Sequence, residues 1–252
     1  MTGASRIRKA DALALAICVA IGIACLGAIG EQGRNRAKEA VCLSNARGLS
    51  QAWLQFAEDH DGNLVGGHTH TGQWVDRDPV GATLVQQKEA IRRGVLFPYV
   101  GKVQMYHCPA DPRRQDSLYV TYRTFAIPGG ANGEMWSGYT RARRITDLTR
   151  PSKQYVFVEE ADPRGIQIGS WQMNPGTKTW VDPLAMWHPE RTTLGFADGH
   201  AETHPWQNRS LIGWCHRAMY ESGQFAFSMT PPADEREDVE YMAAGFPCKS
   251  IP

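Results

Sequence analysis

The sequence lacks the short signatures that mark common hydrolases and zinc sites. It contains no Gly-x-Ser-x-Gly nucleophile motif, no His-Glu-x-x-His motif and no Cys-x-x-Cys pair among its six cysteines. The formal net charge is only +1, so the excess of basic residues that is typical of nucleic-acid binding is also missing. We therefore expect a protein that is not an enzyme and does not bind nucleic acid.

One apolar run without charged residues lies near the N-terminus, from Ala12 to Ile29. As a helix it would be roughly 27 Å long, close to the thickness of the hydrocarbon core of a bilayer. We predict a basic start and a transmembrane helix over residues 1–30. A cleaved secretory signal is the alternative, because the run is rich in alanine and of intermediate length.

The helical pattern continues beyond the apolar run. Apolar residues recur at steps of four and three, which is typical of one face of an amphipathic helix. Asp61-Gly62 follows, and glycine is favoured just after a helix end. The pattern predicts one helix from about Asp11 to about His60, with residues 31–62 as its amphipathic part. The predicted buried face consists of Cys42, Ala46, Leu49, Trp53 and Phe56.

Residues 187–206 have the pattern of a β-hairpin. Leu194 and Phe196 alternate with smaller residues, and Asp198-Gly199 forms a turn in which glycine takes a positive φ. A two-residue turn would place His200, Glu202 and His204 on one polar face. That row is either a solvated sheet face or a set of transition-metal ligands.

Four segments, in this order, resemble the H-X9-DG family of bacterial prepilin-like proteins. The first, residues 36–65, holds Cys42, Ser44 and Asn45; the second, residues 94–112, holds Cys108, Pro109 and Asp111. The third is residues 144–162, with a Pro-Ser pair, an apolar strand and acidic residues. The fourth holds His188, nine intervening residues and Asp198-Gly199, the motif that gives the family its name.

The resemblance implies an α+β, pilin-like fold. A long, partly transmembrane N-terminal helix would pack on an antiparallel sheet head at residues 63–206, followed by a C-terminal extension at 207–252. It implies a structural pseudopilin of a type II secretion or type IV pilus-like assembly at the bacterial inner membrane, with a periplasmic or surface-exposed head. Other pilin-like subunits or the secretion machinery would be its partners.

The prepilin cleavage pattern departs from that family. The residues at the expected cleavage positions are Ala10, Asp11 and Leu15, where glycine, an apolar residue and glutamate are expected. This departure favours the alternative function, a membrane-anchored extracytoplasmic module that binds polysaccharide or an envelope protein without forming filaments.

The motif residues have a structural and a metal-binding interpretation. In the structural interpretation Asp198 and Gly199 form the turn, and His188 bonds a backbone group or Asp198. No cofactor is certain, but calcium is the candidate if Asp198 is joined by nearby carboxylates. A metal-dependent envelope hydrolase built on His188, Asp198, His200 and His204 is the last hypothesis. The full set of candidate metal ligands is Glu159, Glu160, Asp162, His188, Asp198 and His200.

Four cysteines lie beyond the apolar run, and we predict that Cys42 pairs with Cys108 and Cys215 with Cys248. Tryptophan is dense in the C-terminal half and indicates a surface that binds sugar or a partner, a filled core or a subunit interface, of which subunit contact is favoured. These tryptophans are Trp171, Trp180, Trp187, Trp206 and Trp214. The predicted strands are Met105–His107, Tyr119–Phe125, Gln154–Glu159, Thr192–Ala197 and His200–Pro205, with a helix around Leu211–Glu221.

Overall fold

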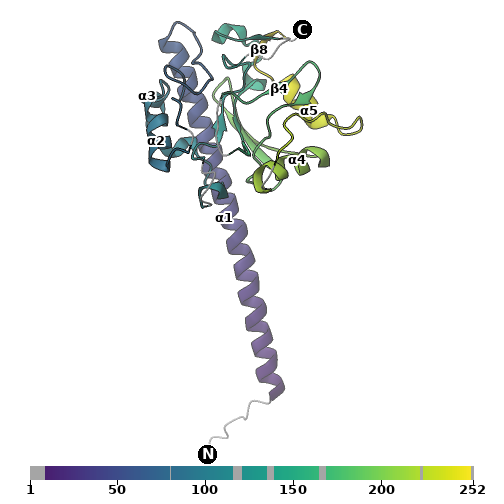
Figure 1. The fold of residues 1–252 in the computed structure, drawn as a ribbon. Helices are drawn as coiled ribbons and strands as arrows, with labels where there is room; N and C mark the ends of the chain where they lie inside the picture. The colour runs from purple at the N-terminus through teal and green to yellow at the C-terminus, as the bar shows by residue number, and fades with distance from the viewer. Residues whose placement is uncertain are drawn as a thin grey trace, which may run out of the picture. The chain divides into compact units, whose positions relative to one another are not determined.

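The longest element of the computed structural model is α1 (Lys9–Asp59), a single helix of 51 residues (Figure 1). The structure describes residues 9–79, 81–115, 121–134, 139–164, 169–221 and 224–250. The predicted helix from about Asp11 to about His60 is confirmed. It ends where Asp61 and Gly62 adopt φ angles of +53° and +80°. Gly62 donates its N–H to the carbonyl of Ala57 over 2.7 Å, which closes the last turn.

The other elements are short. The helices are α2 (Leu84–Arg93), α3 (Phe97–Val100), α4 (Arg209–Tyr220) and α5 (Glu237–Ala244). The 3-10 turns are η1 (Val103–Tyr106), η2 (Pro112–Gln115), η3 (Ile145–Asp147) and η4 (Pro151–Lys153). The strands are β1 (Phe125–Ala126), β2 (Thr140–Arg141), β3 (Tyr155–Glu159), β4 (Met173–Asn174), β5 (Thr179–Trp180), β6 (Arg191–Phe196), β7 (Ala201–Pro205) and β8 (Cys248–Ser250).

The chain divides into two units, Met1–Lys38 and Glu39–Pro252. In the first unit, the side chains of 13–22 are described and all are exposed. No helix in the described part of the chain is long and apolar enough to cross a membrane. The prediction of a partly transmembrane helix is therefore wrong for the described residues. The side chains of Ala12 and 23–29, also in the predicted span, lie outside the described residues.

The second unit contains the predicted buried helix face and an antiparallel sheet. All five residues of that face are at most 9% exposed, so this part of the prediction is confirmed. The sheet has the strand order β1-β3-β6-β7, and each neighbouring pair is antiparallel. Every residue of β3 is buried, as is β6 after Arg191, so both faces of the two central strands are covered.

Three of the predicted strands match β3, β6 and β7 to within one or two residues, and the predicted helix near the C-terminus matches α4. The predicted strand Met105–His107 is wrong, because its first two residues end the 3-10 turn η1. Of the predicted strand Tyr119–Phe125, only Phe125 lies in a strand, and residues 119 and 120 lie outside the described part of the chain.

The β6–β7 hairpin forms as predicted, but with a different register. A two-residue turn would pair Gly195 with Glu202. In the structure Gly195 pairs with Ala201 and Leu194 with Glu202, so the register is shifted by one position. The loop is longer than predicted because Phe196 and His200 close it, with the Phe196 N–H bonded to the His200 carbonyl over 2.8 Å. Gly199 has φ +87°, as the turn prediction required.

The segment after Trp206 belongs to the second unit. In Figure 1, α4 and α5 lie side by side. They are joined by Asp238, a buried carboxylate that accepts the backbone N–H groups of Gln207 and Asn208 over 3.0 and 2.8 Å. β8 pairs with β2, so the last described strand is also anchored to the unit.

Candidate metal centre

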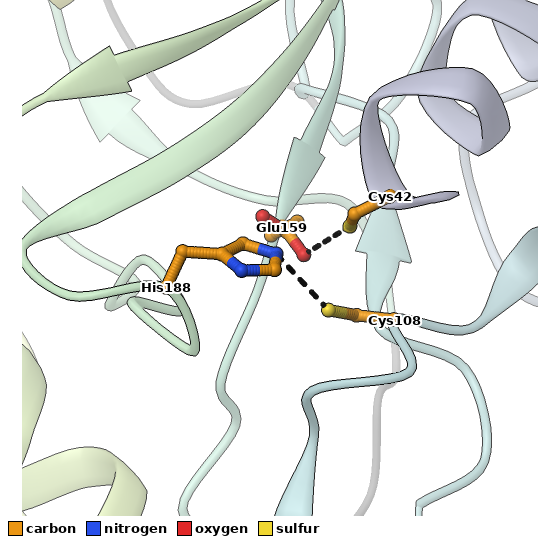
Figure 2. Close-up of side chains that lie close together, drawn as sticks. All are labelled: Cys42, Cys108, Glu159 and His188. Atoms are coloured by element: carbon orange, nitrogen blue, oxygen red, sulfur yellow. Dashed lines mark hydrogen bonds between the residues drawn. The ribbon is translucent and has the colours of Figure 1, made fainter. Parts of the chain in front are cut away.

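Four metal-ligating side chains meet in the interior of the second unit (Figure 2). They are Cys42, Cys108, Glu159 and His188, and together they are called the four-residue cluster. Two thiol sulfurs, one carboxylate oxygen and one imidazole nitrogen all lie within 4.8 Å of one another. Each of the four residues is at most 2% exposed. The ligand atoms are therefore close enough for one ion to contact all of them.

Each residue of the cluster comes from a different segment. Cys42 lies on the buried face of α1, and Glu159 is the last residue of β3. Cys108 lies two residues after η1, and His188 lies in the turn before β6. Because β3 and β6 are antiparallel neighbours, the end of β3 lies beside the beginning of β6.

A tight turn fixes the position of His188. The carbonyl of His188 accepts the N–H of Arg191 over 3.0 Å, and Glu190 within the turn has φ +52°. Pro189 follows the histidine directly and restricts its backbone to extended conformations. The turn therefore holds the histidine at a defined place before β6 begins.

Hydrogen bonds connect the cluster internally. The Cys42 thiol donates to Oε1 of Glu159 over 2.8 Å, and Cys108 Sγ lies 3.5 Å from Nε2 of His188. The second carboxylate oxygen of Glu159 accepts the backbone N–H of Thr193 over 2.7 Å. Cys108 Sγ accepts the N–H of Ala110 over 3.4 Å. These contacts orient the four ligand atoms towards a common centre.

Burial controls the thiol charges. It raises the pKa of Cys42 well above its ordinary value, and the contacts with Cys108 and the charge of Glu159 raise that pKa further. Burial likewise raises the pKa of Cys108 to about 11. Without a cation, both thiols therefore hold their protons at neutral pH. A divalent cation in the centre would instead favour the thiolates.

Two of the six predicted metal ligands, Glu159 and His188, belong to the cluster. Asp162 instead binds Arg164 at 2.5 Å, and Asp198 binds His200. Glu160 is buried but is not one of the four. In the described part of the chain, these predicted residues therefore do not form one site around Asp198, and the calcium interpretation loses its carboxylate set.

The predicted disulfides do not form. Cys42, Cys108 and Cys215 are buried free thiols, and Cys248 is buried as well. Cys42 and Cys108 do lie in the same cluster, but they form no disulfide. The Cys42 thiol donates a hydrogen bond to the carboxylate of Glu159. These two cysteines, which were predicted to form a bridge, are instead candidate metal ligands.

A signal for the cluster was present in the sequence. Each of the four segments that carry the family resemblance contributes one residue: Cys42, Cys108, Glu159 and His188 in turn. The sequence motif instead suggested that His188 bonds Asp198 or a backbone group. In the structure His188 faces Cys108, while Asp198 bonds the ring of His200 within the hairpin loop.

The polar row on β7 is not a metal site. His200 stacks on Phe196 at 4.3 Å between ring centroids, and His204 stacks on Tyr241 at 3.8 Å. Glu202 accepts a hydrogen bond from the Tyr241 hydroxyl. With these side chains engaged by aromatic rings, and His188 elsewhere, the hydrolase hypothesis has no constellation among the described residues.

The tryptophans of the C-terminal half do not form an exposed platform. All five are at most 8% exposed. Trp180 makes edge contacts with Trp171 and Trp206, with ring centroids 6.3 Å apart in both cases. They fill the interior of the second unit, so the prediction of a sugar-binding or subunit-contact surface on these residues is wrong.

Comparison of the chain with models of protein families, with curated proteins and with solved structures found no match. The resemblance to prepilin-like proteins therefore remains a prediction from the four segments. The function has to be argued from the geometry of this chain.

Proposed function

We propose that the chain is a structural subunit of a pilin-like envelope assembly and not an enzyme. In this proposal the N-terminal stretch of α1, residues 13–22, packs against the same stretch of neighbouring pilin-like subunits. The second unit acts as the folded head of the subunit. The observation that carries the proposal is the exposed apolar surface of residues 13–22.

Large apolar side chains in this stretch alternate with small ones. Positions two apart on a helix point in directions about 200° apart, so the large residues cover several sides of α1. A helix that is apolar all round is stable in water only when other apolar groups surround it. The large residues and their exposed fractions are Leu13 63%, Leu15 66%, Ile17 50%, Val19 52% and Ile21 58%.

The free energy available from covering this surface is large. Completing the burial of five half-exposed aliphatic side chains contributes on the order of 5 kcal/mol per subunit. Patches of this kind on soluble proteins mark sites of association. Because the large residues lie on several sides of the helix, one subunit can contact more than one neighbour, as a filament requires.

The four-residue cluster supports a structural role for the second unit. Its side chains are buried on every side, and four protein groups surround the centre. A catalytic metal centre keeps at least one position open for water or substrate. The alternative of a polysaccharide-binding module depended on a surface formed by the five tryptophans named above, and all five of these side chains are buried.

The test compares two single substitutions in the first unit of the full-length protein. Ile17→Glu places a charge in the apolar stretch, and Gln32→Glu places the same charge at an exposed polar position of the same helix. Self-association is measured by sedimentation velocity and electron microscopy over a wide range of concentration. We expect Ile17→Glu to weaken association by about 100-fold or more, because an unpaired buried carboxylate is strongly unfavourable.

Gln32→Glu should associate like the wild type. Equal association of the wild type and the Ile17→Glu variant would contradict the proposal. So would a wild-type protein that stays monomeric at every concentration and instead binds lipid vesicles through residues 13–22.

A further inference from the structure

We infer that the four-residue cluster binds one Zn²⁺ ion in a closed structural site that joins α1 to the sheet. The ligands are the thiolates of Cys42 and Cys108, Oε1 of Glu159 and Nε2 of His188. This site is independent of the association of residues 13–22, because all four ligands belong to the second unit.

The first argument is the composition of a fully buried polar group. Four side chains that can each ligate a metal come from segments far apart in the chain and converge in the interior. Cys42 donates to Glu159, yet among the described residues no lysine or arginine forms an ion pair with that carboxylate. A buried carboxylate without a cation is costly. A divalent ion at the centre would neutralise it.

The second argument is geometric. With Zn–S bonds of about 2.3 Å and Zn–N or Zn–O bonds of about 2.0–2.1 Å, the edges of a tetrahedral site measure about 3.3–3.8 Å. Cys108 Sγ and His188 Nε2 are already 3.5 Å apart. Cys42 Sγ and Glu159 Oε1 are 2.8 Å apart, which is a thiol hydrogen bond, and they would separate by under 1 Å when zinc replaces the proton.

The third argument is ligand chemistry. Two sulfurs, one nitrogen and one oxygen form a borderline-soft set in tetrahedral arrangement, which suits Zn²⁺. Calcium and magnesium require more oxygen ligands than this cluster offers. Because four protein atoms complete the coordination and no side is open, the ion would hold structure and would not bind substrate.

The surrounding hydrogen bonds already hold the ligands as a metal site needs. The N–H of Thr193 occupies Oε2 of Glu159, which leaves Oε1 directed into the cluster. The N–H of Ala110 bonds Cys108 Sγ, an interaction that favours the thiolate. Such outer contacts orient ligands and strengthen metal binding.

The test uses the full-length protein purified without chelator and without added metal. Elemental analysis should give one zinc per chain. Replacement of zinc by Co²⁺ should give the intense visible bands of tetrahedral cobalt and a thiolate charge-transfer band in the near ultraviolet. These two readouts require no substitution, so they remain decisive even where a variant fails to fold.

Matched variants then assign the ligands. Cys108→Ser and Glu159→Gln should each weaken Co²⁺ binding, by about 100-fold or more for the thiolate. Cys215→Ser removes a buried thiol outside the cluster and should leave the cobalt spectrum unchanged. In the wild type, zinc should protect Cys42 and Cys108 from alkylation, and a chelator should remove that protection.

Three results would overturn the inference. The first is a protein that contains no metal and gives no tetrahedral cobalt spectrum. The second is mass mapping that shows a Cys42–Cys108 disulfide in the purified protein. The third is a different metal bound at one equivalent by the same residues, which would disprove the assignment to zinc.

Discussion

The two ends of α1 contain similar numbers of apolar residues but arrange them differently. In residues 42–57, buried apolar side chains recur every three or four positions and face the interior of the second unit. In residues 13–22, large apolar side chains recur every second position and are exposed. The first spacing gives one buried stripe, and the second places large apolar side chains on several sides of the helix. Spacing therefore determines whether a helix completes its packing within its own chain or needs other molecules.

A second difference concerns the polar residues near each end. The buried stripe includes Cys42, which donates a hydrogen bond to Glu159 of β3. Ser50 lies next to this stripe and packs closely against Gly195 of β6. No charged residue lies between Ala12 and Ile29. The part of α1 in the second unit thus has specific partners, while the apolar stretch has a nonspecific surface. Substitutions at the two ends should have different consequences.

The largest effect should come from the buried stripe. Trp53 is 0% exposed, and Trp53→Ala should lower the free energy of unfolding of the second unit by about 3–5 kcal/mol, because it removes a large side chain and leaves a cavity. Ile17→Ala in the exposed stretch is the control and should change it by under about 0.5 kcal/mol. Urea unfolding followed by circular dichroism measures both. Equal effects of the two substitutions would remove the distinction between the ends of α1.

A smaller effect should follow from crowding the contact between α1 and the sheet. A Cβ atom at Gly195 of β6 would lie 2.3 Å from Ser50 Oγ and 3.0 Å from the carbonyl oxygen of Ala46. Gly195→Ala should therefore destabilise the protein by about 1–3 kcal/mol. Adding Ser50→Ala removes the nearest atom and should restore part of the loss. Thermal unfolding of the single and double variants tests the contact.

Gly213→Ala is the matched control for this substitution. Gly213 lies inside α4, and the nearest atom to its added Cβ is the end of the Arg217 side chain at 3.8 Å. Alanine there should stabilise the helix by up to about 1 kcal/mol. If both alanine variants were equally stable, Gly195 would not mark a close approach between α1 and β6.

Local patterns in the sequence were sufficient to predict α1, its buried face, the strands β3, β6 and β7, and α4. Each has a period or a turn signal that depends only on nearby residues. The hairpin register was wrong by one position, because Asp198-Gly199 was taken as a two-residue turn, whereas Phe196 and His200 close a longer loop. A turn signal alone does not fix loop length.

The cluster could be predicted only in part, because it depends on contacts between distant segments. Glu159 and His188 were identified as metal candidates, but their expected partners were Asp198 and other carboxylates instead of Cys42 and Cys108. The 3-10 turn η1 and the loop after it bring Cys108 to the cluster, and a strand was expected there. No local sequence pattern predicts that this loop brings Cys108 close to Glu159 at the end of β3.

The smallest expected effect is a pH dependence of stability that comes from Asp182, a residue outside α1. Burial is the main cause that raises the pKa of Asp182 to about 7; the N–H of Gln172 lowers this pKa, and the negative charge of Asp162 contributes to raising it. A carboxyl group with a raised folded-state pKa stabilises the fold below its unfolded pKa and loses that contribution as pH rises through about 7. Asp182→Asn carries no charge and should not show this loss.

The stability of Asp182→Asn relative to the wild type should therefore increase between about pH 4 and pH 8, by about 1 kcal/mol because solvent screens the partly exposed side chain. Urea unfolding at a series of pH values measures the difference, and a flat or falling difference would contradict it. Self-association through residues 13–22 should be the same in the variant and the wild type at each pH. A change in association would mean that the stability of the second unit controls the apolar stretch, and the two ends of α1 could no longer be treated as independent.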